Sequence, residues 1–126
     1  DWRNQNTFFL KTGEAKTYIG KYRGVNRIPL LKLSEMYLIA AEASGDKGYL
    51  QTLRDHRGYV NYPLEENCDL AAEIEAEYRK EFMAEGQLFY YYKRLDYNTL
   101  PDMGVVMTGN YVFPMPDDEM EFGDIK

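Results

Sequence analysis

The residues able to act as nucleophiles, bases or metal ligands are few in this chain. Histidine occurs once, as His56, and cysteine once, as Cys68. A serine–histidine or cysteine–histidine pair would have to use His56, which we interpret as an ordinary residue on the surface of a helix. One histidine and one cysteine barely supply a zinc site, and the glycine motifs that bind phosphates or dinucleotides are absent. The sequence therefore predicts no cofactor and no metal site.

Carboxylates are plentiful, and two of them are unusual. Most lie in helical patterns where water or a cation four residues away would satisfy them, as with Glu75 and Arg79. A glycosidase needs two carboxylates at a defined separation, so a carboxylate-pair hydrolase remains a third, disfavoured hypothesis. Glu81 and Glu85 point toward an apolar stripe, and a buried carboxylate needs a partner. The candidate partners are two pairs of cations, and we expect the resulting ion pairs to lock helices in register: Arg54 and Arg57, or Lys93 and Arg94.

Aromatic residues are the other unusual feature, with 12 Tyr, 6 Phe and 1 Trp. The run Tyr90–Tyr92 covers nearly every side of a helix, so at least one of its rings is exposed unless another part of the protein covers it. Sugar-binding surfaces use such rings, because the apolar face of a sugar stacks on them. Trp2, Tyr90 and Tyr91 are therefore the candidate ligand contacts. The alternative interpretation is that these rings pack against other protein.

Composition limits the remaining possibilities. The 126 residues are 44% hydrophobic and carry a formal net charge of −6, which fits one folded region and makes a poor match to a nucleic-acid backbone. No apolar run of about 18 residues exists to span a membrane. A single cysteine cannot form an internal disulfide. Because the first residue is Asp1, we expect a processed chain or a piece of a longer one.

The spacing of apolar residues predicts two helices joined by a tight turn. The first runs over 28–44, with Pro29 in its first turn, and the second over 47–57. Gly45 suits a helix C-terminus and Asp46 suits the following N-cap. The two helices should form a helical hairpin. Four apolar residues are expected between them: Leu33, Tyr37, Leu50 and Leu53.

The flanking segments carry weaker signals. A long third helix is predicted from a cap at Asp69 to about Leu95, interrupted by Gly86. Residues 1–27 are predicted to be loop with one or two short strands, such as 17–22. Residues 105–107 and 111–113 flank a Gly-Asn pair that suits a β-hairpin turn, and an irregular C-terminal segment follows. The predicted fold class is mainly α.

The order of motifs resembles one protein family. Taken singly each motif is weak, but together they cover nearly the whole chain and resemble the C-terminal part of SusD/RagB-like nutrient-binding proteins. The matching segments, in chain order, are Asp1–Arg3 (DWR), Lys21–Tyr22 (KY), Ile28–Ala43 (IPLLKLSEMYLIAAEA), Leu53–Gly58 (LRDHRG), Glu77–Gly86 (EYRKEFMAEG) with Phe89 and Lys93–Arg94, and Tyr111–Met120 (YVFPMPDDEM). The chain departs from the family pattern at Tyr78, Leu88 and Tyr91, which puts the charged partners of the third helix in doubt.

The resemblance implies both a fold and a function. Members are longer, surface-exposed lipoproteins of the outer membrane with tetratricopeptide-like helical hairpins. They bind oligosaccharides, or peptides and other nutrients, and pass them to a SusC-like TonB-dependent transporter without acting as enzymes. On this basis residues 1–126 form a single region, mostly scaffold, of a larger domain whose missing N-terminal part is a partner. The alternative, from another functional class, is a tetratricopeptide-like scaffold that binds only protein.

Overall fold

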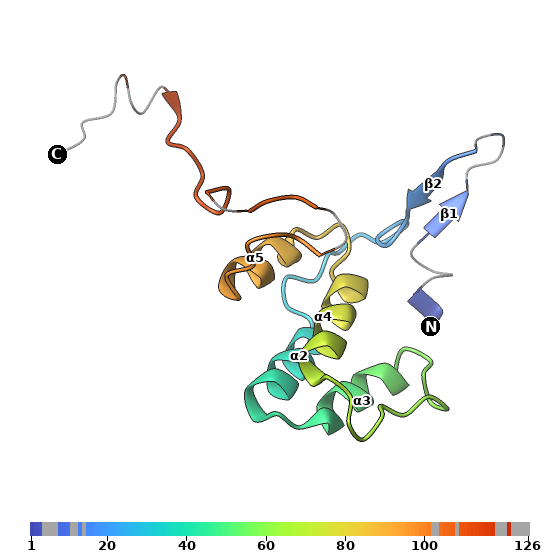
Figure 1. The fold of residues 1–126 in the computed structure, drawn as a ribbon. Coiled ribbons are helices and arrows are strands. Elements are labelled where there is room, and N and C mark those ends of the chain that lie inside the picture. The colour runs from blue at the N-terminus through green and yellow to red at the C-terminus, as the bar shows by residue number, and fades with distance from the viewer. Residues whose placement is uncertain are drawn as a thin grey trace. The chain divides into compact units, whose positions relative to one another are not determined.

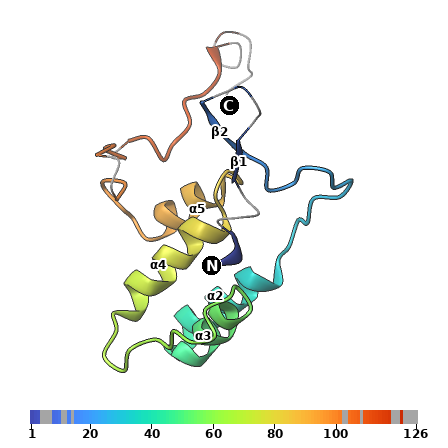
Figure 2. The same ribbon diagram turned by 90° about the vertical axis from the view of Figure 1, so that its right-hand side faces the viewer.

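The computed structural model describes residues 1–3, 8–10, 13, 15–101, 104–107, 109–117 and 121. It divides into two compact units, 1–86 and 87–126, each of which is described by itself. The chain is mainly α-helical (Figures 1 and 2), as the sequence predicted. No helix among the described residues has the length and apolar character needed to cross a membrane.

The first unit is built on a helical hairpin. Helix α2 spans Leu33–Ser44 and helix α3 spans Lys47–Asp55. Gly45 adopts a left-handed conformation with φ of 69° and donates its N–H to the Ala41 carbonyl oxygen at 3.0 Å. Asp46 then caps α3 by accepting from the Gly48 N–H at 2.8 Å. Gly45 therefore ends the first helix and Asp46 caps the second, as their residue types predicted.

Helix α4, Leu70–Glu81, packs on α2 and completes the core of this unit. Asp69 caps it by accepting from the Ala72 N–H at 3.2 Å. The buried residues of this core are Leu38 and Ala41 from α2, Leu50 and Leu53 from α3, and Ile74, Tyr78 and Phe82 from α4 and its end. Burying such side chains stabilises a fold by about 1.5–3 kcal/mol each, so these three helices form the stable part of the unit.

The first helix begins later than predicted. Residues 28–31 are not helical, and Lys32, the residue before α2, is extended with φ −117° and ψ 137°. Its side chain binds Glu85, at the far end of α4. Leu33 is exposed, so the prediction that it lies between the hairpin helices is wrong, whereas Leu50 and Leu53 are buried as predicted.

The single long third helix is also corrected. The chain leaves helical geometry at Phe82 and resumes it in α5, Gln87–Arg94, so two shorter helices replace one. Ala84 and Gly86 both have positive φ, at 62° and 76°. The Glu81 carbonyl oxygen, freed at the helix end, accepts a hydrogen bond from Lys21. The hydrogen bond from Lys21 thus takes the place of a backbone hydrogen bond within the helix, although the apolar periodicity of the sequence continues past this point.

A small β-hairpin precedes the helices. Strands β1, Phe8–Leu10, and β2, Thr17–Ile19, pair antiparallel with Phe8 opposite Ile19. This agrees with the prediction of short strands in this region.

The predicted hairpin near the C-terminus is wrong over the described residues. In the second unit, Val106 instead bridges back to Thr99, and the Met107 N–H bonds to the Asn98 carbonyl oxygen at 2.8 Å. Met107 is buried there, while Phe113 stays exposed. Burial of Met107 and pairing with the chain after α5 therefore replace the predicted pairing with 111–113.

Candidate functional site

Three glutamates, four residues apart, line one side of α4 and its end. We call Glu77, Glu81 and Glu85 the glutamate ladder. Positions i and i+4 lie on the same helix face, and here that face turns inward: Glu77 and Glu81 are buried. Burying carboxylates is costly unless each is paired and hydrogen-bonded, so the partners define what the ladder does.

Glu81 is bound from several segments. Arg57 donates from Nε to Oε2 at 3.0 Å and from a terminal nitrogen to Oε1 at 2.8 Å. Ser34 of α2 donates to Oε1 at 2.9 Å, and Arg3 approaches Oε2 at 3.3 Å. Burial alone would raise the pKa of Glu81, but the hydrogen bonds and charge of Arg57 outweigh it and lower the pKa to about 2. Glu81 is therefore a permanent anion near neutral pH, which is unsuited to giving or taking protons there.

The other two glutamates of the ladder, Glu77 and Glu85, also form ion pairs. Arg3 binds Glu77 at 2.7 Å, and Lys80 binds the other oxygen of Glu77 at 2.8 Å. Lys21 and Lys32 both bind the Oε1 atom of Glu85. Burial opposes the charge of Glu85, yet the hydrogen bonds from these two lysines lower its pKa. The ladder thus connects the N-terminal segment, the segment before α2 and the end of α3 to one helix.

The sequence identified part of this network. The prediction that Arg57 pairs with a buried glutamate is confirmed at Glu81, and Arg54 binds Glu73 at 2.8 Å. Lys93, in the second unit, donates to the Tyr111 carbonyl oxygen. Reasoning from helices missed Arg3, Lys21 and Lys32, none of which lies in helices α2 to α5. The available signal was their place in the DWR, KY and IPLLKL motifs.

The three candidate aromatic contacts differ in exposure. Trp2 is 61% exposed; its backbone N–H bonds to the Arg57 carbonyl oxygen at 3.1 Å, and its ring lies against Gly58. Tyr90, in the other unit, is 63% exposed and contacts Phe89 edge-on. Tyr91 is only 6% exposed, so its ring is buried and does not face solvent. Trp2 and Tyr90 therefore present rings to solvent, and one ring of the Tyr90–Tyr92 run is exposed as predicted.

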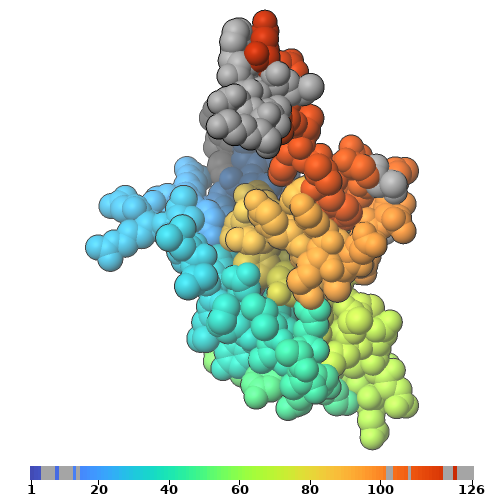
Figure 3. All heavy atoms as spheres, turned by 90° about the vertical axis from the view of Figure 1, so that its left-hand side faces the viewer, coloured from blue at the N-terminus to red at the C-terminus, as the bar shows by residue number. Residues whose placement is uncertain are grey.

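An apolar face remains uncovered in the first unit. Residues 25–31 project from the helices (Figures 2 and 3), and Leu30 is 91% exposed. Exposed side chains continue onto α2. The members of this apolar face are Val25, Ile28, Leu30, Leu31, Leu33, Met36 and Ile39. Seven large apolar side chains exposed within one short stretch of sequence are unusual in a soluble protein and favour a surface that packs against other protein.

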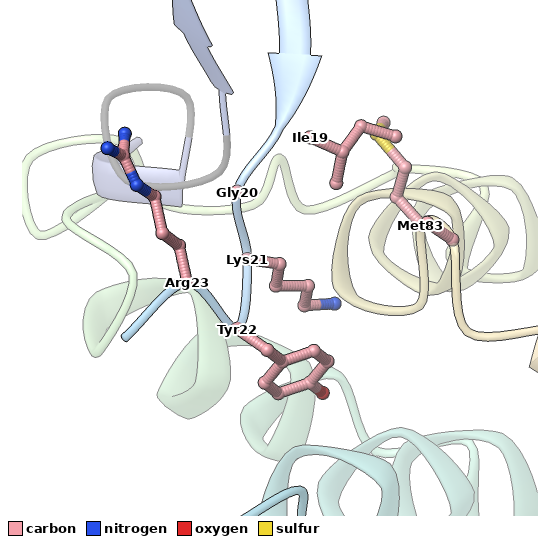
Figure 4. A pocket seen from close by; sticks show the side chains of 7 residues that line it. Ile19, Gly20, Lys21, Tyr22, Arg23 and Met83 are labelled. Carbon is pink, nitrogen blue, oxygen red and sulfur yellow. The ribbon is translucent and has the colours of Figure 1, made fainter. Parts of the chain in front are cut away.

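A cavity of about 510 Å³ lies beside the ladder. Ile19–Arg23 from the end of β2 and the following turn line it, together with Met83 and Ala84 after α4. In Figure 4 Lys21 extends toward the end of α4, with Ile19 and Met83 to one side and Tyr22 to the other, whereas Arg23 points away. The cavity therefore combines apolar walls with one amine.

The remaining reactive residues form no site in the described part of the chain. The Nδ1 atom of His56 lies 2.8 Å from the Thr52 carbonyl oxygen, a contact within one helical turn. Cys68 is a free thiol. Over the residues with described positions, no three His, Cys, Asp or Glu side chains gather as metal ligands.

Comparison of the chain with protein-family models, curated proteins and solved structures finds no match.

Proposed function

We propose that this chain is a scaffold portion of a SusD/RagB-like protein that captures nutrients at the bacterial cell surface. In this proposal the protein is a lipoprotein of the outer membrane that binds an oligosaccharide, or a peptide, and delivers it to a SusC-like TonB-dependent transporter. Capture depends on aromatic stacking and hydrogen bonding, with no bond broken in the ligand.

The uncovered apolar face is the observation that best supports a scaffold role. All of its residues except Val25 belong to the IPLLKLSEMYLIAAEA segment that carries the strongest resemblance to the family. Leaving about seven large apolar side chains in water forgoes about 1.5–3 kcal/mol for each one that could be buried. A further part of the same protein packed on this face would recover that free energy.

The exposed rings support the ligand-binding part of the proposal. Trp2 and Tyr90 offer apolar faces of the kind that stack on sugars, and the backbone contact of Trp2 with Arg57 fixes its position. A sugar stacked on one such ring buries little surface, so the affinity contributed by this portion is weak. In this proposal most ligand contacts come from elsewhere in the protein.

A second function is favoured by the same apolar face. The α2–α3 hairpin resembles a tetratricopeptide unit, and such units present surfaces to other proteins. In that case the apolar face would bind a separate protein, and Trp2 and Tyr90 would make no contact with sugar.

Fluorescence distinguishes these two functions, because Trp2 is the only tryptophan in the chain. The chain would be titrated with maltohexaose, xylohexaose and a short fructan while Trp2 emission is followed, and products would be analysed for new reducing ends. The proposal expects a saturable change with at least one sugar and no new ends.

The matched variants are Tyr90→Ala and Tyr62→Ala. Tyr62 is a comparably exposed tyrosine at 67% that the proposal gives no role. Loss of affinity in Tyr90→Ala but not in Tyr62→Ala supports a sugar contact at Tyr90. Unchanged affinity in both variants removes Tyr90 from the site, and a silent Trp2 with every sugar removes Trp2 from it.

A further inference from the structure

Two lysines share one carboxylate beside the cavity. Lys21 and Lys32 both bind Glu85, and the three side chains are mostly buried, with 18%, 12% and 14% of their surface exposed. Two cations and one anion leave one positive charge unbalanced. Burial makes an unbalanced charge costly, and the usual relief is loss of a proton from one amine.

The surroundings decide which lysine keeps its proton. The Lys32 Nζ lies 5.2 Å from the ring centroid of Phe82 and 5.6 Å from that of Tyr22, and both rings favour a cation. Although burial opposes it, the hydrogen bond to Glu85 raises the pKa of Lys32. Burial has the larger effect at Lys21 and lowers its pKa. Lys21 is therefore the amine that more readily becomes neutral.

The other charged groups nearby do not reverse this order. Glu81 offers Lys21 only its backbone carbonyl oxygen, because its carboxylate is bound by Arg57 and Ser34. Arg23 lines the cavity but points away from Lys21 (Figure 4).

A neutral Lys21 would keep its contacts and gain a reactive lone pair. A primary amine has two N–H groups, which match its two acceptors, the Glu81 carbonyl oxygen and Glu85. The lone pair is then free to attack an electrophile. Tyr22 also lines this cavity, next to Lys21 (Figure 4).

We propose that Lys21 is a reactive amine that forms a Schiff base with a small aldehyde entering this cavity. The nitrogen lone pair attacks the carbonyl carbon, and the carbonyl π electrons move to oxygen to give a carbinolamine. The two amine hydrogens leave with that oxygen as water, and a C=N bond remains. The apolar walls formed by Ile19 and Met83 favour an aldehyde with a short hydrocarbon chain.

Reductive trapping tests the proposal. The full chain would be incubated at pH 7 with limiting butanal and cyanoborohydride, which reduces the imine to a stable secondary amine, and peptide mass spectrometry would report the modification rate at each lysine. Lys21 is expected to react faster than Lys47, because burial lowers the pKa of Lys21. In concentrated urea the two rates should become equal. Equal rates in the folded chain would overturn the proposal.

A matched pair of variants tests the cause. Lys32→Met removes the second cation while keeping a similar apolar stem, so Glu85 would stabilise the charge on Lys21 alone and the reactivity of Lys21 should fall below its wild-type value. Lys47→Met removes a lysine whose contacts are the carbonyl oxygens of Glu65 and Glu66, and should leave the Lys21 rate unchanged. Circular dichroism would check that both variants fold. A Lys21 rate unaffected by Lys32→Met would show that shared charge does not activate it, contrary to the proposal.

Discussion

Replacing Glu81 by glutamine should change the pH dependence of stability in a defined way. The pKa of Glu81 falls from its usual value of 4.5 to about 2 in the folded chain. A depressed pKa means that folding favours the ionised form, so the stabilisation is present above pH 4.5 and is lost as the pH falls toward 2. At about 1.4 kcal/mol for each pKa unit, the total is about 3 kcal/mol.

The quantity to measure is the difference in free energy of unfolding between wild type and Glu81→Gln. Near pH 7 the variant should be less stable by about 3–5 kcal/mol, because Arg57 is left without its buried anion. As the pH falls, Glu81 in the wild type becomes protonated and resembles glutamine. The difference should therefore narrow by about 2 kcal/mol by pH 3 and by about 3 kcal/mol by pH 2.

Urea unfolding followed by circular dichroism between pH 7 and pH 2 would give these values. Other carboxylates also titrate in this range, but they do so in both proteins and cancel in the difference. Glu73→Gln is the control on the same helix: its side chain is 39% exposed and binds Arg54 at 2.8 Å. Because the Glu73 carboxylate is partly in water, its ion pair contributes less than a fully buried one, so this control should lose less stability at pH 7 than Glu81→Gln. A difference for Glu81→Gln that stays constant from pH 7 to pH 2 would refute the reasoning.

Three further substitutions test local features of the fold. Gly58→Ala should destabilise the chain by about 1–3 kcal/mol in urea unfolding and shift Trp2 emission, because Gly58 has φ of 92° and an added Cβ would lie 2.7 Å from the Trp2 ring nitrogen. Asp46→Ala removes the N-cap of α3 and should cost about 1 kcal/mol in the same assay; an unchanged midpoint would contradict the capping role. Leu31→Glu should leave the unfolding free energy within about 0.5 kcal/mol while reducing the binding of an apolar dye, since Leu31 is exposed on the apolar face. Strong destabilisation by Leu31→Glu would mean that this residue is buried.

The hairpin could be predicted because its determinants are local. Gly45 and Asp46 end one helix and begin the next through contacts within four residues along the chain. Leu50 and Leu53 fall on one face by helical spacing alone. Such signals need no knowledge of the rest of the fold, which is why the sequence was sufficient here.

The break between α4 and α5 could not be predicted for the opposite reason. The apolar pattern continues from Ile74 through Phe82 to Phe89, and one glycine costs a helix only about 1 kcal/mol. What competes is a contact from 60 residues away, the hydrogen bond from Lys21 to the Glu81 carbonyl oxygen. Periodicity carries no information about that partner.

The same distinction between local and long-range signals explains which residues of the candidate site could be predicted. Glu81 and Arg57 both lie at helix ends, where spacing shows which way they face, and their pairing was predicted. Arg3 and Lys21 lie in stretches of the sequence without a periodic apolar pattern, so neither their orientation nor their burial could be inferred. Tyr91 shows the same limit, since a run of three tyrosines requires one exposed ring without saying which of them it is.

The buried charges and the exposed Trp2 ring belong to one arrangement. Arg3, next to Trp2, binds both Glu77 and Glu81, while the Trp2 N–H binds the carbonyl oxygen of Arg57, whose side chain also holds Glu81. The network that neutralises a buried carboxylate therefore fixes the backbone on both sides of this ring. A ring held in this way loses less conformational entropy when a ligand stacks on it, which favours binding without any additional contact. In the ligand-binding role that we propose for Trp2, substitutions in the charged face of α4 would therefore change affinity through the position of this ring.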